Sequence, residues 1–238
     1  MRNLQNLDLA QRGNMPYRFF GPLIFDPYMF TTLRLQRVMI ECDASCLAGI
    51  HTLELHETSG TILNQYQLSF ATYPDIPNAP AMPHLTSLHI YGTNLIISNT
   101  PILPSFSVDS ILSLELSNIH MTGSLSVFPI VSLFNITLNP RLERLILHNI
   151  DLASMHQFVQ IIRTHSPKFP VLQSLTISHL NLFAFAGYIM PATPAISSLT
   201  LINVVMNVEE VRESLRDIDL WPLIVTFIFD GVEYSRSY

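Results

Sequence analysis

Leucine and other apolar residues recur along this chain at a fixed spacing. In the segment RLERLILHNIDL they occupy relative positions one, four, six, nine and eleven, counted from Leu142. This frame, LxxLxLxxΦxΦ with Φ apolar, occurs in nine copies, of which four are weaker. Side chains alternate between the two faces of a strand, so LxL points two leucines into a core and the residue between them away from it. The frame predicts nine short parallel strands, which must stack because one repeat cannot bury its apolar face alone. The fourth-position residues are Leu7, Leu33, Leu53, Leu88, Leu114, Leu145, Leu175, Leu199 and Phe227.

The spacing of the copies gives the length of a repeat. Between Leu7 and Phe227 the eight spacings average 27.5 residues, inside the range of about 20–29 residues known for leucine-rich repeats. Two neighbouring spacings deviate, because 20 residues separate Leu33 from Leu53 and 35 separate Leu53 from Leu88. Two interpretations are open: the third strand is out of phase, or residues 60–83 form an insertion.

The connecting segments have mixed character. Residues 151–165 have apolar side chains at helical spacing and predict a helix. Residues 207–218 predict a second, amphipathic helix, with Asn207 as its cap and Glu210 three residues later. Residues 74–83 and 100–106 contain several prolines and predict loops or short turns.

The composition excludes several classes of protein. Only 13% of residues are charged, against about 25% in typical soluble domains, and 48% are hydrophobic, which excludes a disordered chain. The net charge of −6, without a cluster of Lys and Arg, argues against a nucleic-acid partner. Residues 181–195, the longest nearly uncharged apolar stretch, contain Gly187, Pro191 and Pro194 and are too short to span a membrane. The first 14 residues lack the apolar region of a signal peptide, so we expect a cytoplasmic or nuclear protein.

Residues that could support catalysis or metal binding do not form a known arrangement. His51 and His56 are five residues apart, whereas a helical zinc site needs a spacing of four. Cys42 and Cys46 lack a second ligand pair and are expected to be reduced thiols. The sequence has no HExxH, P-loop, GxGxxG or GxSxG motif. We therefore expect no catalytic residues, no cofactor, no metal and no enzymatic activity.

The frame resembles the leucine-rich repeats of F-box proteins. The segments FPVLQSLTISHLNL and PAISSLTLINVVM, in which proline precedes the strand, look most like fungal F-box-like proteins. The resemblance implies an α/β solenoid, a ribonuclease-inhibitor-like horseshoe with a parallel sheet on its concave face and helices and irregular turns on its convex face. We expect residues 1–238 to form one such domain of about nine repeats, an N-terminally truncated fragment without the F-box helices.

One departure from the common repeat concerns position nine. The usual residue there is Asn or Cys, whose side chain satisfies backbone groups, but here it is Val, Ile or Leu in six of the nine copies. Asn118, Asn149 and Asn203 stand one residue earlier and could supply part of the missing asparagine ladder.

The outward strand positions are the candidate binding surface. Position three is small and polar in every copy except at Arg144, while position five is charged or titratable in the first five copies and apolar or hydroxylic in the last four. Exposed apolar residues on a sheet indicate a contact surface, and aromatic and Arg side chains are the usual anchors of an interface. The candidate partner-binding residues on the concave face are Arg34, Glu54, His56, His89, Tyr91, Glu115, Arg144, Ile146, His148, Ile202 and Ile228.

These observations predict a protein–protein interaction module. By resemblance, the repeats would recognise the substrates of an F-box-type ubiquitin ligase, with a target protein on the concave face and the ligase adaptor bound only through the missing F-box. The alternative is a generic intracellular leucine-rich-repeat scaffold or sensor domain unrelated to ubiquitination.

Overall fold

The structure is a computed structural model of all 238 residues. It describes residues 5–10, 18–20, 29–36, 38–43, 48–56, 69–71, 84–91, 110–118, 140–150, 169–179, 189, 192–205, 208–216 and 221–236. The chain divides into two compact units, which are treated separately below. Unit 1 comprises residues 1–111 and 121–133, and unit 2 comprises residues 112–120 and 134–238.

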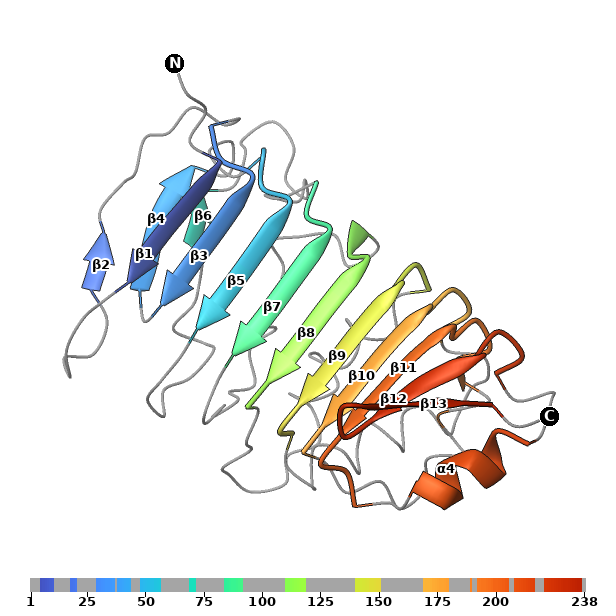
Figure 1. The fold of residues 1–238 in the computed structure, drawn as a ribbon. Coiled ribbons are helices and arrows are strands. Elements are labelled where there is room, and N and C mark those ends of the chain that lie inside the picture. The colour runs from blue at the N-terminus through green and yellow to red at the C-terminus, as the bar shows by residue number, and fades with distance from the viewer. Residues whose placement is uncertain are drawn as a thin grey trace, which may run out of the picture. The chain divides into compact units, whose positions relative to one another are not determined.

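Unit 1 is built on four parallel strands, each paired with the next strand of the frame (Figure 1). The paired strands are β1 (Asn6–Ala10), β3 (Thr32–Gln36), β5 (Thr52–His56) and β7 (Ser87–Tyr91). The register places Leu53 beside both Leu33 and Leu88. The third strand is therefore in phase with its neighbours, and the unequal spacings reflect connectors of unequal length.

Unit 2 continues the same pattern and then ends differently. Its parallel strands are β8 (Ser113–Ser117), β9 (Arg144–His148), β10 (Ser174–Ser178), β11 (Ser198–Ile202) and β12 (Thr226–Phe229). A final strand, β13 (Val232–Ser235), pairs with β12 in the antiparallel direction. The predicted fold class, an α/β chain built mostly on parallel strands, is confirmed at this level.

The core contains the side chains that the frame directs inward. Residues at positions one, four and six from the second copy onward, Phe229 excepted, are at most 6% exposed, and the residue between each buried pair lies on the opposite face, here called the outer face. Leu7 and Leu9 of β1 differ, because both are only half-buried. The buried frame residues are Phe30, Leu33, Leu35, Ile50, Leu53, Leu55, Leu85, Leu88, Ile90, Ile111, Leu114, Leu116, Leu142, Leu145, Leu147, Leu172, Leu175, Ile177, Ile196, Leu199, Leu201, Ile224 and Phe227.

The residue at position eight of the frame follows directly after the strand, and its backbone is left-handed in every copy in which the structure describes it. Asn118, Asn149, His179 and Asn203 have φ values between 49° and 56°, a region in which asparagine is enriched among non-glycine residues. The amide of Asn149 donates from Nδ2 to Oδ1 of Asn118 at 2.8 Å. The asparagine ladder expected one residue early is thus present between these two copies.

The ninth copy of the frame does not complete a repeat, which corrects the prediction of nine equivalent copies. Val232 stands at apolar position nine of that copy, but it begins β13 and is 54% exposed. The reversal occurs at Asp230 and Gly231, whose φ values of 48° and 81° are those of the type I′ turn that joins hairpin strands. Oδ1 of Asp230 also accepts a hydrogen bond from the backbone N–H of Asn203 at 2.5 Å.

Buried polar groups hold the end of unit 2 together. Nε1 of Trp221 donates to Oγ1 of Thr193 at 2.8 Å, and that hydroxyl donates to the carbonyl of Ile189 at 2.8 Å. Nη1 of Arg236, a residue only 7% exposed, donates to the carbonyl of Trp221 at 2.8 Å. Each buried donor therefore has an acceptor, as buried polar groups require.

Unit 1 contains a second sheet where irregular turns were expected. Strands β2 (Arg18–Phe20), β4 (Val38–Asp43) and β6 (Ser69–Ala71) pair in parallel in that order. Strand β4 begins two residues after β3 ends, so the apolar residues at positions nine and eleven of that copy continue as strand. Extended backbone is the physical preference of the β-branched Val38 and Ile40.

The helix predictions have mixed outcomes. The helix expected at residues 207–218 is present as α4 (Val208–Ser214), and Val211 and Leu215 are buried as the apolar spacing predicts. Its expected cap at 207, the helix at 151–165 and the loops at 74–83 and 100–106 lie outside the described residues. Within the described ranges, no helix is both long and apolar enough to cross a membrane.

Candidate functional site

The predicted partner-binding residues all lie on strands that the structure describes, at outer-face positions three, five or seven. They divide between the two units, so they form two surfaces, called the unit 1 face and the unit 2 face. The unit 1 face contains Arg34, Glu54, His56, His89 and Tyr91, and the unit 2 face contains Glu115, Arg144, Ile146, His148, Ile202 and Ile228.

An ion-pair network crosses the first strands of the unit 1 face. Nη1 of Arg34 lies 3.7 Å from Oδ2 of Asp8 on β1, and Nε of Arg34 lies 3.4 Å from Oε2 of Glu54 on β5. The register accounts for this, because Asp8, Arg34 and Glu54 are direct neighbours on three adjacent strands. A cation between two anions suits parallel strands, where equivalent positions stand side by side.

His56 extends this network through a single ring nitrogen. Its Nε2 lies 3.2 Å from Nε of Arg34 and 3.2 Å from Oε2 of Glu54. A neutral ring protonated at Nδ1 accepts from Arg34 at Nε2, whereas a ring protonated at Nε2 donates to Glu54. The same atom cannot do both, so the proton on His56 determines which neighbour it binds.

The position of the ring also affects its basicity. Burial holds the pKa of His56 below its ordinary value of 6.5, and the positive charge of Arg34 lowers the pKa further. The hydrogen bond to Glu54 opposes this and raises the pKa, but burial is the larger effect. His56 is therefore mostly neutral at pH 7, and its tautomer determines whether Nε2 accepts from Arg34 or donates to Glu54.

Aromatic contacts continue the network to β7. The rings of His56 and Tyr91 stack with centroids 4.2 Å apart and planes 18° from parallel. Nδ1 of His89 lies 3.3 Å from the hydroxyl of Tyr91, and Nε2 of His89 lies 2.8 Å from Oγ of Ser87. The unit 1 face is thus a continuous row of hydrogen-bonding and aromatic side chains over four strands, and it holds Tyr91 in a fixed orientation.

The unit 2 face differs because its one predicted cation stands apart from acids. Arg144 is exposed, and on the neighbouring strands it stands beside Ser113 and Ser174. Within the described part of the chain its guanidinium makes no ion pair or hydrogen bond. The five N–H groups of this side chain are therefore available to an acceptor on another molecule.

Two hydroxyl groups at position seven are more buried than the frame suggests. Ser117 and Ser178 are 3% and 4% exposed. Oγ of Ser117 donates to Oε1 of Glu115 at 3.1 Å, and Oγ of Ser178 lies 2.5 Å from Nδ1 of His148. The ring of His148 also makes an edge contact with His179, with centroids 5.0 Å apart. Glu115 is thus held by a serine two residues along its own strand, and His148 by the serine beside it on the neighbouring strand.

The apolar part of the unit 2 face lies toward its last strands. Ile202 at position seven of β11 is 37% exposed and Ile228 at position five of β12 is 39% exposed. Thr200 pairs directly with Ile228, which places the two isoleucines on neighbouring strands of one face. Ile146 on β9 is half-buried.

Three residues that bind the predicted side chains on the two faces were not predicted from the repeat frame. Asp8, Ser87 and Ser178 contact predicted residues but carry no anchor-like side chain of their own. Strand register would have found two of them, since Asp8 is beside Arg34 and Ser178 is beside His148 in adjacent strands. Ser87 would have followed from the rule that residues i and i+2 share a face of a strand.

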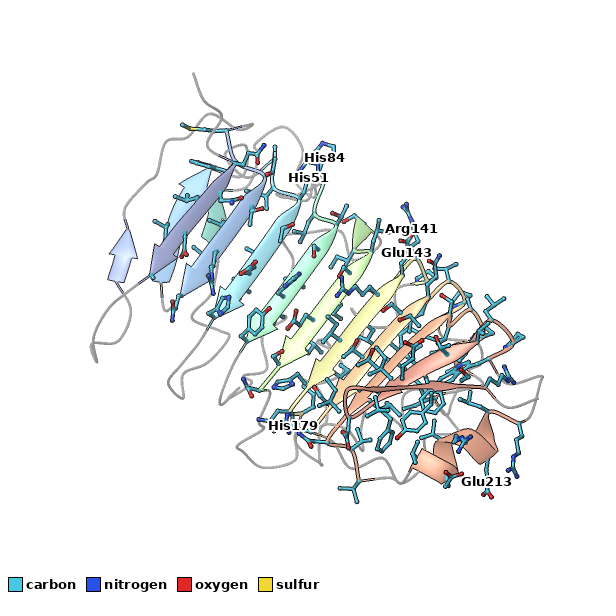
Figure 2. The ribbon with its side chains drawn as sticks, viewed as in Figure 1. His51, His84, Arg141, Glu143, His179 and Glu213 are labelled. Atoms are coloured by element: carbon cyan, nitrogen blue, oxygen red, sulfur yellow. The ribbon has the colours of Figure 1, made fainter. Side chains whose placement is uncertain are left out.

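Metal chemistry has little support in the described residues, among which no group of three His, Cys, Asp or Glu side chains could hold one ion. Figure 2 shows His51 and His84 side by side, with stacked rings 5.9 Å apart, but Nδ1 of His51 already lies 2.9 Å from the carbonyl of Gly49. Comparison with protein-family models, with curated proteins and with solved structures gave no match. Functional inference therefore depends on the two faces themselves.

Proposed function

We propose that this protein is a protein–protein interaction module of the leucine-rich-repeat class, which holds a target protein on the outer faces of its parallel strands. The proposal is supported by the nine-fold frame in the sequence, by the burial of its leucines and by the in-register pairing of successive strands. In such a solenoid the outer face described here is the concave face of a horseshoe.

The observation that carries the proposal is the composition of the unit 2 face. Ile202 and Ile228 are exposed apolar side chains on neighbouring strands, and on the same face the exposed Arg144 makes no ion pair or side-chain hydrogen bond with any described residue. Exposed Ile on a sheet costs solubility without contributing to the core, so a contact surface accounts for it. Apolar anchors together with an Arg are the usual composition of an interface centre.

We also propose the biological setting that the sequence resemblance implies. The repeats recognise substrates for an F-box-type ubiquitin ligase in the cytoplasm or nucleus, and a separate F-box segment binds the ligase adaptor. In this scheme the repeats select the target and the F-box segment makes the contact with the adaptor.

The double variant Ile202→Ser with Ile228→Ser tests the interaction face. Its matched control is Leu223→Ser with Val225→Ser, which replaces residues that are 57% and 60% exposed but do not occupy outer-face positions of the frame. Captured proteins are quantified by mass spectrometry for the wild type and both variants. We expect one set of captured proteins to be lost with the first variant and kept with the control. Equal capture by the wild type and both variants would refute the proposal that Ile202 and Ile228 bind a target protein.

The ligase setting needs a separate experiment. Fusion of an F-box to this chain should shorten the half-life of each protein that the Ile202 and Ile228 variant fails to capture, and this shortening should disappear when the fusion carries that variant. Captured proteins whose half-life does not change would refute substrate recognition for ubiquitination while leaving the interaction face intact.

A further inference from the structure

Strand β13 gives unit 2 an edge unlike any other strand edge that the structure describes. It is the last strand in the order of its sheet and the only one that runs antiparallel to its neighbour in that sheet. In the part of the chain that the structure describes, no strand pairs with the side of β13 away from β12, so its N–H and C=O groups there form an open edge, which can pair with another extended chain.

The register of the hairpin determines which groups point to that open side. Phe229 pairs with Val232 across the two-residue turn, and Phe227 pairs with Tyr234. Pairs next to a two-residue turn are hydrogen-bonded, and hydrogen-bonded pairs then alternate along an antiparallel ladder. Val232 and Tyr234 therefore direct their backbone groups to β12, while Glu233 and Ser235 direct theirs outward. The bond from the N–H of Arg236 to the carbonyl of Val225, 2.8 Å long, continues the same alternation.

The side chains along this edge are accessible. Val232, Glu233 and Ser235 are exposed, and Val232 is 54% exposed. Tyr234 is half-buried, and its ring stacks on Phe227 with centroids 5.5 Å apart. The stack holds the ring of Tyr234 on the face of the sheet that also bears Val232.

We propose that β13 pairs with β13 of a second copy of this chain, antiparallel, with the two-fold axis at Tyr234. In this register Glu233 stands opposite Ser235 of the second copy, and Ser235 opposite Glu233. Both are hydrogen-bonded pairs, which gives four backbone hydrogen bonds in total. The two Tyr234 residues face each other as the closely spaced, non-hydrogen-bonded pair at the axis.

The sequence of the strand favours a second copy over an unrelated peptide, because it is complementary to itself. Each carboxylate of Glu233 meets a hydroxyl, which can donate to it, and does not meet another carboxylate. On the opposite face the two Tyr234 rings meet each other, and aromatic cross-strand pairs stabilise sheets. A contact of this kind is isologous and closes at two copies. The contact is short, so we expect dimerisation to depend on concentration.

Charge changes at the paired positions test the proposal. Ser235→Glu places like charges opposite each other twice and should weaken dimerisation about tenfold, since each such contact destabilises a strand pair. Adding Glu233→Lys to it replaces both repulsions with opposite-charge contacts and should restore the dimer. Glu213→Lys makes the same change of charge as Glu233→Lys at an exposed position on α4, so it is the control for that part of the double change. Circular dichroism monitors the folding of each variant.

The readout is molar mass by sedimentation equilibrium over a concentration series. For the wild type and the control, the mass should rise from 26.9 kDa toward twice that value, with a shift to higher concentration for Ser235→Glu alone. A wild type that stays monomeric would overturn the proposal. An extended segment of another protein would then be the remaining candidate for pairing with β13. A dimer that Ser235→Glu does not weaken, or that the double change does not restore, would also overturn it. Capture of target proteins by the isoleucines is measured separately and does not decide this result.

Discussion

The imidazole of His56 and the ring of Tyr91 lie face to face, 4.2 Å apart between centroids. This contact joins β5 to β7 and covers a histidine whose Nε2 lies between a guanidinium and a carboxylate. Burial holds the pKa of His56 below its ordinary value of 6.5. The row of contacts on the unit 1 face therefore includes a group whose charge changes with pH.

The first prediction concerns stability at acid pH. Because the pKa of His56 is lower in the folded chain than its ordinary value of 6.5, its contribution to stability is complete above pH 6.5. As the pH falls below 6.5 the unfolded chain takes up this proton first, so the free energy of unfolding decreases. His56→Gln should show a smaller decrease than the wild type in urea unfolding between pH 8 and pH 5. Equal decreases would show that the ring titrates normally.

The charged neighbours of His56 should move its pKa in opposite directions. Arg34 lowers this pKa and Glu54 raises it, so Arg34→Gln should raise the pKa of His56 and Glu54→Gln should lower it. Titration of the ring by NMR in the two variants measures both shifts against the wild type. Each variant is the control for the other, and shifts of the same sign would contradict the described contacts.

Two adjacent residues of β9 test the phase of the strands. Leu145 is 1% exposed in the core, whereas Ile146 is half-buried on the outer face. Leu145→Asp buries a carboxylate without a partner and should destabilise unit 2 by about 4 kcal/mol or more, enough to unfold it. Ile146→Asp makes the same chemical change on the other face and should leave the circular dichroism spectrum native. A folded Leu145→Asp protein would refute the phase.

The left-handed position at the end of a strand gives a prediction about backbone conformation. Asn149 has φ 50° and binds Oδ1 of Asn118. Asn149→Gly removes the hydrogen bond but keeps the conformation, whereas Asn149→Val removes the bond and adds about 1–2 kcal/mol of backbone strain. Thermal unfolding should therefore rank the wild type first, the glycine variant second and the valine variant last. A valine variant as stable as the glycine variant would show that φ at this position is not constrained.

The parallel strands could be predicted from the sequence because their signal is local and repeated. Leu33 and Leu35 identify the inward face of β3 within three residues, and the same pattern recurs in the later copies. The second sheet could not be predicted in this way, since β2 and β6 have three residues each and are strands only through pairing with β4. The hairpin at Asp230 and Gly231 had a recognisable Asp-Gly signal, but the leucine frame continues through it and favoured a further repeat.

The candidate faces could be predicted only as lists of positions. The frame places Arg34, Glu54 and His56 outward, yet nothing in the spacing says that all three meet at one imidazole nitrogen. This contact depends on the register between β3 and β5, which lie 20 residues apart in the sequence, and on the side-chain rotamers of the three residues. Likewise, the burial of Ser117 and Ser178 depends on the glutamate and histidine that lie over them.

The in-register pairing of β3, β5 and β7 despite unequal spacing has a consequence for how this chain can change. Twenty residues connect Leu33 to Leu53 and 35 connect Leu53 to Leu88, yet the leucines stand side by side. The entropy of closing a flexible loop grows only with the logarithm of its length, about 0.6 kcal/mol for each doubling. Connectors between these strands can therefore lengthen by insertion, at little thermodynamic cost, while the strand positions that form the unit 1 face stay fixed.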